Sequence, residues 1–220
     1  MAAFLDGVTL FKCFDIVSRC GVELNGLIET LNGLIDEKFR LSKDELPCVR
    51  DDAKPTYSGR YDDSGWVYRD IAYSFPLKAP RKKTGPDMYF GYQVSMIGDG
   101  MQFPGNSEPL LHVFLWNCPI DLNEQYIHFP FVPDESLSVV DSRLAVWGEI
   151  DPSNWLDRQW CFSLRLTTLN GPEELLERVV KPTIALLKLG RARDALPDGL
   201  TGMMTYPDVQ TLTDEVIDNA

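Results

Sequence analysis

Residues 160–169 read WCFSLRLTTL, and this stretch decides the fold class. Every second residue from Trp160 to Leu166 is large and apolar, and the residues between them are small or polar. A period of two places the apolar set on one side of an extended chain. The pattern therefore predicts a β-strand in a sheet that has one buried face and one wetter face.

Four further segments are predicted to be strands, namely 66–77, 88–97, 110–118 and 144–150. Residues 110–118 read LLHVFLWNC and are apolar on both sides, which is typical of a central strand covered on both faces. The short connections favour an antiparallel order. Prolines interrupt residues 119–143, so only a short edge strand is expected there, over 126–132.

Helical periodicity marks the two ends of the chain. Residues 8–39 repeat Leu24, Ile28, Leu31 and Ile35 at helical spacing, with a break or kink expected at Gly21. A second helix is predicted over 172–189, with a kink at Pro182. Because helices and strands are segregated along the chain, we predict an α+β fold, with an antiparallel sheet of about five strands flanked by an N-terminal and a C-terminal helix.

The domain prediction follows from length and composition. The chain has 220 residues and is 44% hydrophobic, which suffices for one core without disulfides or metals. We predict a single α+β domain over residues 1–193 and an acidic, loosely ordered tail over residues 194–220. Residues 41–65 are polar and rich in turn residues, so they are predicted to form a long loop.

The charge is strongly acidic and unevenly spread. The net charge is −12, and residues 119–160 and 194–220 each contribute −6, from eight acids with two arginines and from six acids alone. Such a field repels nucleic acid and attracts a basic partner. We therefore expect a basic protein partner and no direct contact with nucleic acid, against the simpler interpretation that the charge only keeps the chain soluble.

The sequence argues against a metal site, a signal peptide and a membrane span. Five cysteines without a CxxC pair and only two histidines lack the spacing of a zinc site, so no metal or cofactor is expected. The first residues lack the basic region of a signal peptide, and no apolar run approaches the ~20 residues of a membrane span. The protein is expected to be cytoplasmic, with no membrane contact.

Two segments mix aromatic and acidic residues, 146–160 (VWGEIDPSNWLDRQW) and 57–66 (YSGRYDDSGW). Tryptophan and tyrosine dominate the binding energy of many interfaces, and carboxylates beside them suit a basic partner. Trp160 is assigned to the core, because it is in register with Phe162. The predicted partner-binding residues are Tyr61, Asp62, Asp63, Trp66, Trp147, Glu149, Asp151, Trp155 and Asp157.

The leading functional hypothesis is a non-enzymatic, cytosolic protein-binding module, such as an inhibitor, an immunity-type protein or a chaperone-like partner of a basic protein. No hydrolase or metalloprotease motif is present. The rival is an enzyme or carbohydrate-binding domain that uses the same Trp/carboxylate patch, with Glu149 and a second acid in a concave pocket. A third hypothesis is a homodimer through the first helix, where Asn-Gly-Leu-Ile occurs at 25–28 and again at 32–35.

Overall fold

The computed structural model describes residues 6–83, 85–103, 105–129, 131, 136–150 and 154–207. This part of the chain contains an antiparallel sheet of eight strands, in the order β1-β3-β4-β5-β8-β7-β6, with β2 also paired to β3. The strands are β1 (Val49–Arg50), β2 (Thr56–Tyr61), β3 (Tyr68–Lys78), β4 (Met88–Ser95), β5 (Leu110–Trp116), β6 (Leu137–Val140), β7 (Leu144–Gly148) and β8 (Arg158–Arg165).

The five predicted strands correspond to β3, β4, β5, β7 and β8. The expected number of about five is corrected to eight, because β1, β2 and β6 lie at the edges of the sheet. An edge strand needs backbone hydrogen bonds more than an apolar face, and no residue of β2 is buried. The edge strand predicted over 126–132 does not form at residues 126–129 and 131, which run as a loop over the sheet.

The mixed α+β class and the N-terminal helix are confirmed. Helix α1 (Gly7–Leu41) begins at Asp6, whose carboxylate accepts hydrogen bonds from the backbone N–H groups of Val8 and Thr9, as an N-cap does. It runs without interruption through Gly21, where a break was expected. Glycine costs an exposed helix only about 1 kcal/mol, which the rest of this long helix outweighs.

The predicted C-terminal helix forms in three consecutive pieces, α2 (Pro172–Leu175), a π-helical turn η4 (Leu176–Val180) and α3 (Lys181–Leu187). The π-helical turn ends two residues before Pro182, whose ring and missing N–H are incompatible with regular helical hydrogen bonding. The short helix α4 (Ala192–Ala195) follows. No described helix combines the length and the apolar character needed to cross a membrane.

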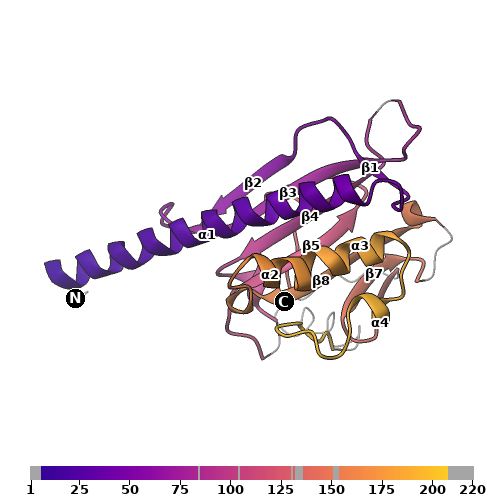
Figure 1. The fold of residues 1–220 in the computed structure, drawn as a ribbon. Helices are drawn as coiled ribbons and strands as arrows, with labels where there is room; N and C mark the ends of the chain where they lie inside the picture. The colour runs from indigo at the N-terminus through magenta and orange to yellow at the C-terminus, as the bar shows by residue number, and fades with distance from the viewer. Residues whose placement is uncertain are drawn as a thin grey trace.

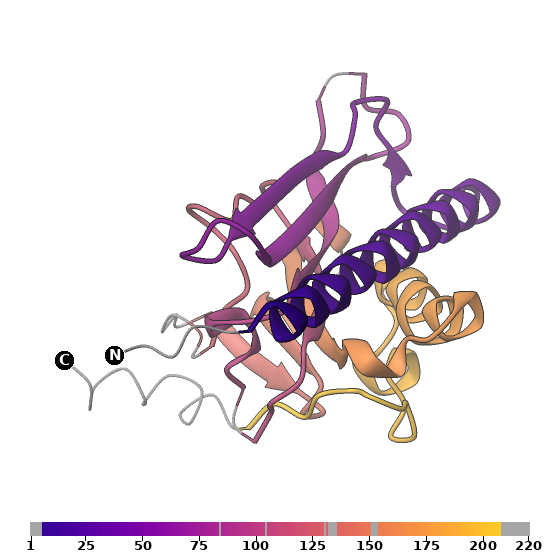
Figure 2. The same ribbon diagram turned by 90° about the vertical axis from the view of Figure 1, so that its left-hand side faces the viewer.

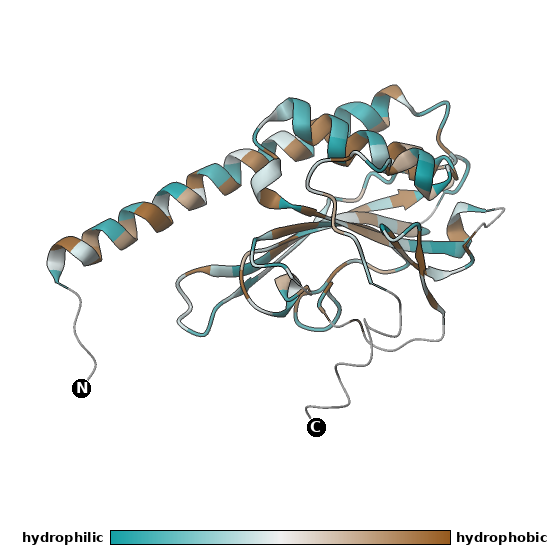
Figure 3. Ribbon diagram, turned by 90° about the horizontal axis from the view of Figure 1, so that it is seen from below, coloured by the Kyte–Doolittle hydropathy of each residue, from teal (hydrophilic) through white to brown (hydrophobic). Residues whose placement is uncertain are grey.

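Helix α1 and the C-terminal helical segment formed by α2, η4 and α3 cover the same face of the sheet (Figures 1 and 3). The second half of α1 buries Ile28, Leu31 and Ile35 there, against a core that includes Trp160 and Phe162 of β8. Burying one such aliphatic or aromatic side chain contributes roughly 1.5–3 kcal/mol. Of the inward-facing set predicted for residues 160–166, Trp160, Phe162 and Leu164 are buried, whereas Leu166 begins a 3-10 turn after β8 and is half-buried.

Loops cover the opposite face (Figure 2). The predicted wetter face of β8 is not wet, since Cys161 and Ser163 are both 0% exposed. Residues of segments 99–103, 117–131 and 202–206 pack over this face in a second apolar cluster. A loop leaves backbone N–H and C=O groups without helical or strand partners, so the side chains beneath it have to supply hydrogen bonds.

A row of polar side chains meets that need. Ser58, Gln93, His112 and Ser163 stand in one register across β2, β4, β5 and β8, with Ala72 of β3 between the first two. We call these four residues the polar row.

Each member of the polar row binds a covering segment. Ser58 accepts from the Leu122 N–H at 3.1 Å, and Gln93 both donates to and accepts from the Ile127 backbone at 2.8 Å. His112 Nε2 lies 2.7 Å from the Gly100 carbonyl oxygen. Ser163 pairs with the Tyr206 hydroxyl at 2.7 Å. The polar row thus fixes three loop segments on the sheet.

The first part of the predicted tail belongs to this cover. Met204 and Tyr206 are 4% and 2% exposed, and the Met204 N–H donates to the Ser163 carbonyl at 2.9 Å. The expectation of a loose tail is therefore corrected for residues 194–207, because Ala195 and Leu196 pack into the helix-covered core and Met204 and Tyr206 into the second apolar cluster. Residues 208–220 lie outside the described residues.

Candidate functional site

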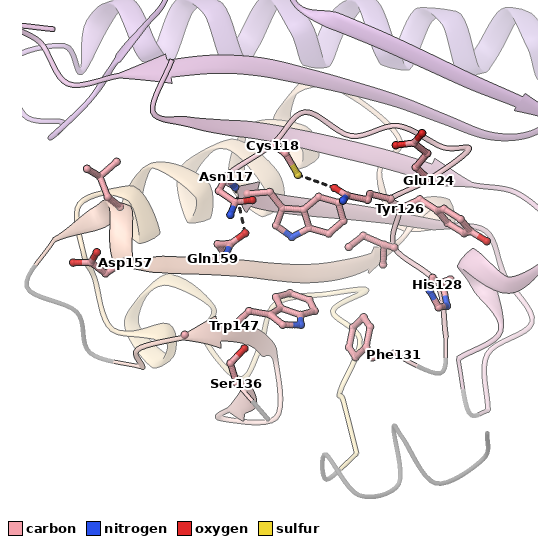
Figure 4. Close-up of a pocket in the computed structure, with 15 residues that line it drawn as sticks. Asn117, Cys118, Glu124, Tyr126, His128, Phe131, Ser136, Trp147, Asp157 and Gln159 are labelled. Carbon is pink, nitrogen blue, oxygen red and sulfur yellow. Dashed lines mark hydrogen bonds between the residues drawn. The ribbon is translucent and has the colours of Figure 1, made fainter. Parts of the chain in front are cut away.

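An open groove with a volume of about 950 Å3 lies on the loop-covered face of the sheet (Figure 4). Three neighbouring strands supply Trp116 from the end of β5, Gln159 from the start of β8 and Trp147 from β7. Trp147 and Gln159 are direct partners in the β7–β8 register, and Gln159 Oε1 accepts from the Asn117 N–H at 3.2 Å. Strand pairing therefore positions this part of the lining.

The groove has aromatic surfaces and a polar rim. Trp116 and Trp147 meet edge to face with ring centroids 6.5 Å apart, and Phe131 meets Trp147 at 5.4 Å. Both tryptophans are half-buried, so each presents part of its ring to a ligand. At the rim, the Cys118 thiol donates to Gln125 Oε1 at 2.8 Å. The groove therefore offers flat apolar contacts at its centre and hydrogen-bonding groups around them.

The charged groups at the groove are acidic. Glu124 and Asp157 are exposed and line it, and they lie on opposite sides of it (Figure 4). Among the described lining residues there is no lysine or arginine. The two carboxylates therefore do not converge on one point of the groove.

The structure divides the residues predicted from the 146–160 segment. Trp147 and Asp157 line the groove, whereas Glu149 is exposed and does not. The expected surface position of Trp155 is corrected, since it is only 5% exposed and packs into the helix-covered core. A 3-10 turn, η2 (Trp155–Asp157), capped by Asn154, leaves Asp157 exposed while Trp155 is buried. Asp151 lies outside the described residues.

The residues predicted from the 57–66 segment form a separate surface. Tyr61, Asp62, Asp63 and Trp66 belong to the end of β2 and the β2–β3 turn, and β4, β5 and β8 separate β3 from β7. The hydrogen bond from the Ser64 hydroxyl and those from backbone N–H groups hold the pKa of Asp62 below its usual value, so its carboxylate stabilises the turn. The two predicted segments therefore do not make one site.

Trp66 of this second surface is 72% exposed, and its ring meets Phe14 of α1 edge to face at 5.7 Å. Tyr61 stacks on Tyr68, with the ring centroids 4.4 Å apart. Trp66 is therefore a neighbour of the first helix, and neither Trp66 nor Tyr61 lines the groove.

Sequence reasoning missed Trp116, Asn117, Glu124 and Gln159. Trp116 is the last residue of the apolar run in β5, and an aromatic residue at a strand end was the available signal. Its neighbours could not be identified, because the order β5-β8-β7 joins strands that lie far apart along the chain.

A charge cluster fixes Tyr126, which also lines the groove. Arg60 donates to Asp70 from Nε at 3.0 Å and from Nη2 at 2.6 Å, and its guanidinium lies 4.0 Å from the centre of the Tyr126 ring. The Tyr126 hydroxyl donates to Asp99 at 2.7 Å, and Asp99 also binds Arg69. Burial alone raises the pKa of Asp99, but the hydrogen bonds from Tyr126 and Arg69 outweigh it and lower that pKa. The two arginines and the two aspartates neutralise one another, and the cluster holds Tyr126 in the lining of the groove.

Comparisons of the chain with protein-family models, curated proteins and solved structures each found no match. Within the described ranges, no three histidine, cysteine or acidic residues are grouped where they could hold a metal ion. The chemistry of the groove therefore has to be inferred from its own residues.

Proposed function

We propose that this protein is a non-enzymatic, cytosolic protein-binding module that holds a basic segment of its partner in the groove. The observation that carries the proposal is the lining itself, two indole rings and two carboxylates without a lysine or arginine among the described residues. The face of an indole attracts a cation, and a carboxylate pairs with lysine or arginine through charge-assisted hydrogen bonds.

The charge of the whole chain supports the same partner. A net charge of −12 attracts a basic protein and accelerates its association. This combination of a neutralising surface and an apolar groove suits an inhibitor, an immunity-type protein or a chaperone-like partner. In this proposal Trp147 and Asp157 keep their predicted role, Trp116 and Glu124 join them, and Trp155 is removed.

A carbohydrate-binding site is the second candidate. The side chains of Asn117 and Gln159 lie beside Trp116 in the lining, and amides beside an aromatic face suit sugar hydroxyls and the apolar side of a sugar ring. A neutral saccharide can donate hydrogen bonds to the two carboxylates but carries no charge to pair with them, whereas a basic peptide does. Charge is therefore the property that separates the two candidates.

The test is a titration of the purified protein with a lysine- and arginine-rich synthetic peptide, followed by tryptophan fluorescence and calorimetry. The matched ligand is the same peptide with acetylated lysines and with citrulline in place of arginine, which removes the charges and keeps the length. We expect the charged peptide to bind, its affinity to fall with added salt, and the uncharged peptide to bind at least tenfold more weakly.

Variants locate the binding. Trp147→Ala is expected to weaken the binding of the charged peptide by about 2 kcal/mol, as for an interface anchor. Asp157→Asn is expected to reduce the dependence of that affinity on salt. Glu149→Gln is the matched control, because this acid is exposed nearby and does not line the groove. Equal binding of both peptides, or Trp147-dependent binding of neutral oligosaccharides in place of the charged peptide, would overturn the proposal.

A further inference from the structure

The first half of α1 projects beyond the sheet (Figures 1 and 3). It carries apolar side chains that are exposed. We call residues 7–23 the projecting segment. The large hydrophobic residues exposed on it are Val8, Leu10, Phe11, Phe14, Ile16, Val17 and Val22. Their exposed fractions run from 44% at Val17 to 71% at Phe11. Leu10, Phe14 and Val17 share one face of the helix, and an exposed apolar face of this kind marks an interaction site.

The exposed stripe continues the stripe that binds α1 to the sheet. Leu24, Ile28, Leu31 and Ile35 follow one another at alternating spacings of three and four residues, and the last three are buried. Upstream the same spacing selects Leu10, Phe14, Val17 and Gly21, all exposed. Because this spacing keeps the side chains on one face of a helix, the projecting segment presents a packing face that stays exposed, with Trp66 beside Phe14 as its aromatic neighbour.

We infer that this partner is the projecting segment of a second copy of the chain, packed antiparallel. With the two-fold axis between residues 15 and 16, Leu10 lies opposite the partner's Gly21, and Phe14 lies opposite the partner's Val17. Each large side chain thus faces a smaller one. An added Cβ at Gly21 would meet no atom of its own chain within 4 Å, so this position has room for the partner's Leu10.

The length of the segment fits the same axis. The helix begins at Gly7, and contact with the core begins at Leu24. The axis that pairs Leu10 with the partner's Gly21 also pairs Gly7 with the partner's Leu24. The two projecting segments therefore overlap along their full length of about 25 Å, and the two sheets lie at opposite ends of the pair.

Charge permits this pairing in spite of the acidic chain. The projecting segment carries Lys12, Asp15, Arg19 and Glu23, and therefore no net charge. All four fall on the helix face opposite the stripe, where Arg19 pairs with Asp15. The separation of the two sheets also exceeds the ~8 Å over which charges interact strongly at physiological salt. Repulsion between two chains of net charge −12 is therefore weak in this arrangement.

The available area is sufficient for a modest dimer. Phe11, Phe14 and Trp66 are 71%, 50% and 72% exposed, which amounts to roughly 400 Å2 of aromatic surface per copy at about 200 Å2 a ring. Trp66 is included because it packs beside Phe14. Together with Leu10 and Val17 on both copies, the total approaches the lower bound of about 1,200 Å2 for a stable interface. A reversible, concentration-dependent dimer is expected.

The isoleucines of the Asn-Gly-Leu-Ile repeat are not available to a second copy. Ile28 and Ile35, which end the two occurrences of the repeat, are buried against the chain's own sheet. The inferred dimer surface is instead the projecting segment, which precedes the repeat in the chain. It also lies apart from the groove, so the inference does not depend on the proposed function.

The first experiment measures mass and orientation on the unchanged chain. Sedimentation over a range of concentrations is expected to show a monomer–dimer equilibrium. Cys13 and Cys20 flank the stripe and are exposed, so a short bismaleimide is expected to link Cys13 to the partner's Cys20. Cys13→Ser should abolish the linked dimer in an antiparallel pair, because Cys20 and the partner's Cys20 then lie nine residues, or about 13 Å, apart along the helices. A parallel pair would retain it through Cys20 and the partner's Cys20, and that result would overturn the orientation.

Substitutions then test the stripe. Phe14→Glu is expected to shift the dissociation constant upward at least tenfold, while Lys12→Glu, on the charged face of the same helix, shifts it less than threefold. Circular dichroism checks that both variants keep the helix. Peptide binding in the groove should be unchanged in Phe14→Glu. A chain that is monomeric at every concentration, or a dimer that survives Phe14→Glu, would overturn the inference.

Discussion

Acidification is expected to weaken the fold through His112. This residue is 0% exposed in β5, and its two ring nitrogens lie 2.7 Å from Ser163 Oγ and from the Gly100 carbonyl oxygen. A carbonyl oxygen only accepts, so Nε2 carries the proton and Nδ1 accepts from Ser163. The ring is therefore held neutral, and burial lowers its pKa to about 4.

The size of the effect follows from that pKa. In the unfolded chain the histidine has a pKa near 6.5, so below this pH the unfolded state binds a proton that the folded state does not. Stability from this group is therefore fully present above about pH 6.5 and is lost as the pH falls toward about 4. Each unit of pKa difference is worth about 1.4 kcal/mol, so the total loss is about 3 kcal/mol.

The assay is urea unfolding at several pH values between 7.5 and 4, followed by circular dichroism. Between pH 7.5 and 4 the free energy of unfolding of the unchanged chain should fall by about 3 kcal/mol more than that of His112→Gln. Glutamine keeps a donor and an acceptor but does not titrate. Carboxylates with lowered pKa values, such as Asp62 and Asp99, act in both proteins and cancel in the difference. His128→Gln is the control, and its free energy of unfolding should fall on acidification as much as that of the unchanged chain. Parallel pH profiles for the His112→Gln and unchanged chains would refute the reasoning.

Two further predictions concern buried residues. Trp155→Ala should lower the free energy of unfolding by about 3–5 kcal/mol, as for a large core side chain, whereas Trp66→Ala, at a 72% exposed position, should change it by about 0.5 kcal/mol or less. Denaturant unfolding of the two variants measures both changes. Equal free energies of unfolding would show that Trp155 is not in the core. Cys48 and Cys161 are buried, with pKa values raised to about 12 by burial, so iodoacetamide should modify them only after unfolding. Peptide mass mapping reads the modified sites, and labelling of Cys48 in the native chain would contradict its burial.

The strands that could be predicted are those with one face in the core. In β8 the large apolar residues Trp160, Phe162 and Leu164 alternate with smaller ones. This alternation predicts the strand, because these three side chains pack into the helix-covered core. β2 could not be found in this way. Its residues Ser58 and Gly59 pair with β3 through the backbone, and an edge strand leaves no such period in the sequence.

The candidate site was predicted in part for a similar reason. Trp147 and Asp157 could be found because a large aromatic residue and a carboxylate in one hairpin are visible locally. Trp155, in the same hairpin, was placed wrongly, since a single 3-10 turn decides which of its residues face the core. Trp116 reaches the groove through pairing between strands distant along the chain, and local sequence does not encode that register.

The polar row has a consequence for how the chain finds its strand alignment. A slip of β4 by one residue would turn Gln93 toward the helices and leave the Ile127 N–H and C=O groups buried without a partner. An orphaned buried polar group costs about 1–3 kcal/mol. The apolar face alone tolerates a slip of two residues, since one large side chain replaces another. The hydrogen bonds of Gln93 and His112 do not, so they select the native alignment from shifted ones during folding.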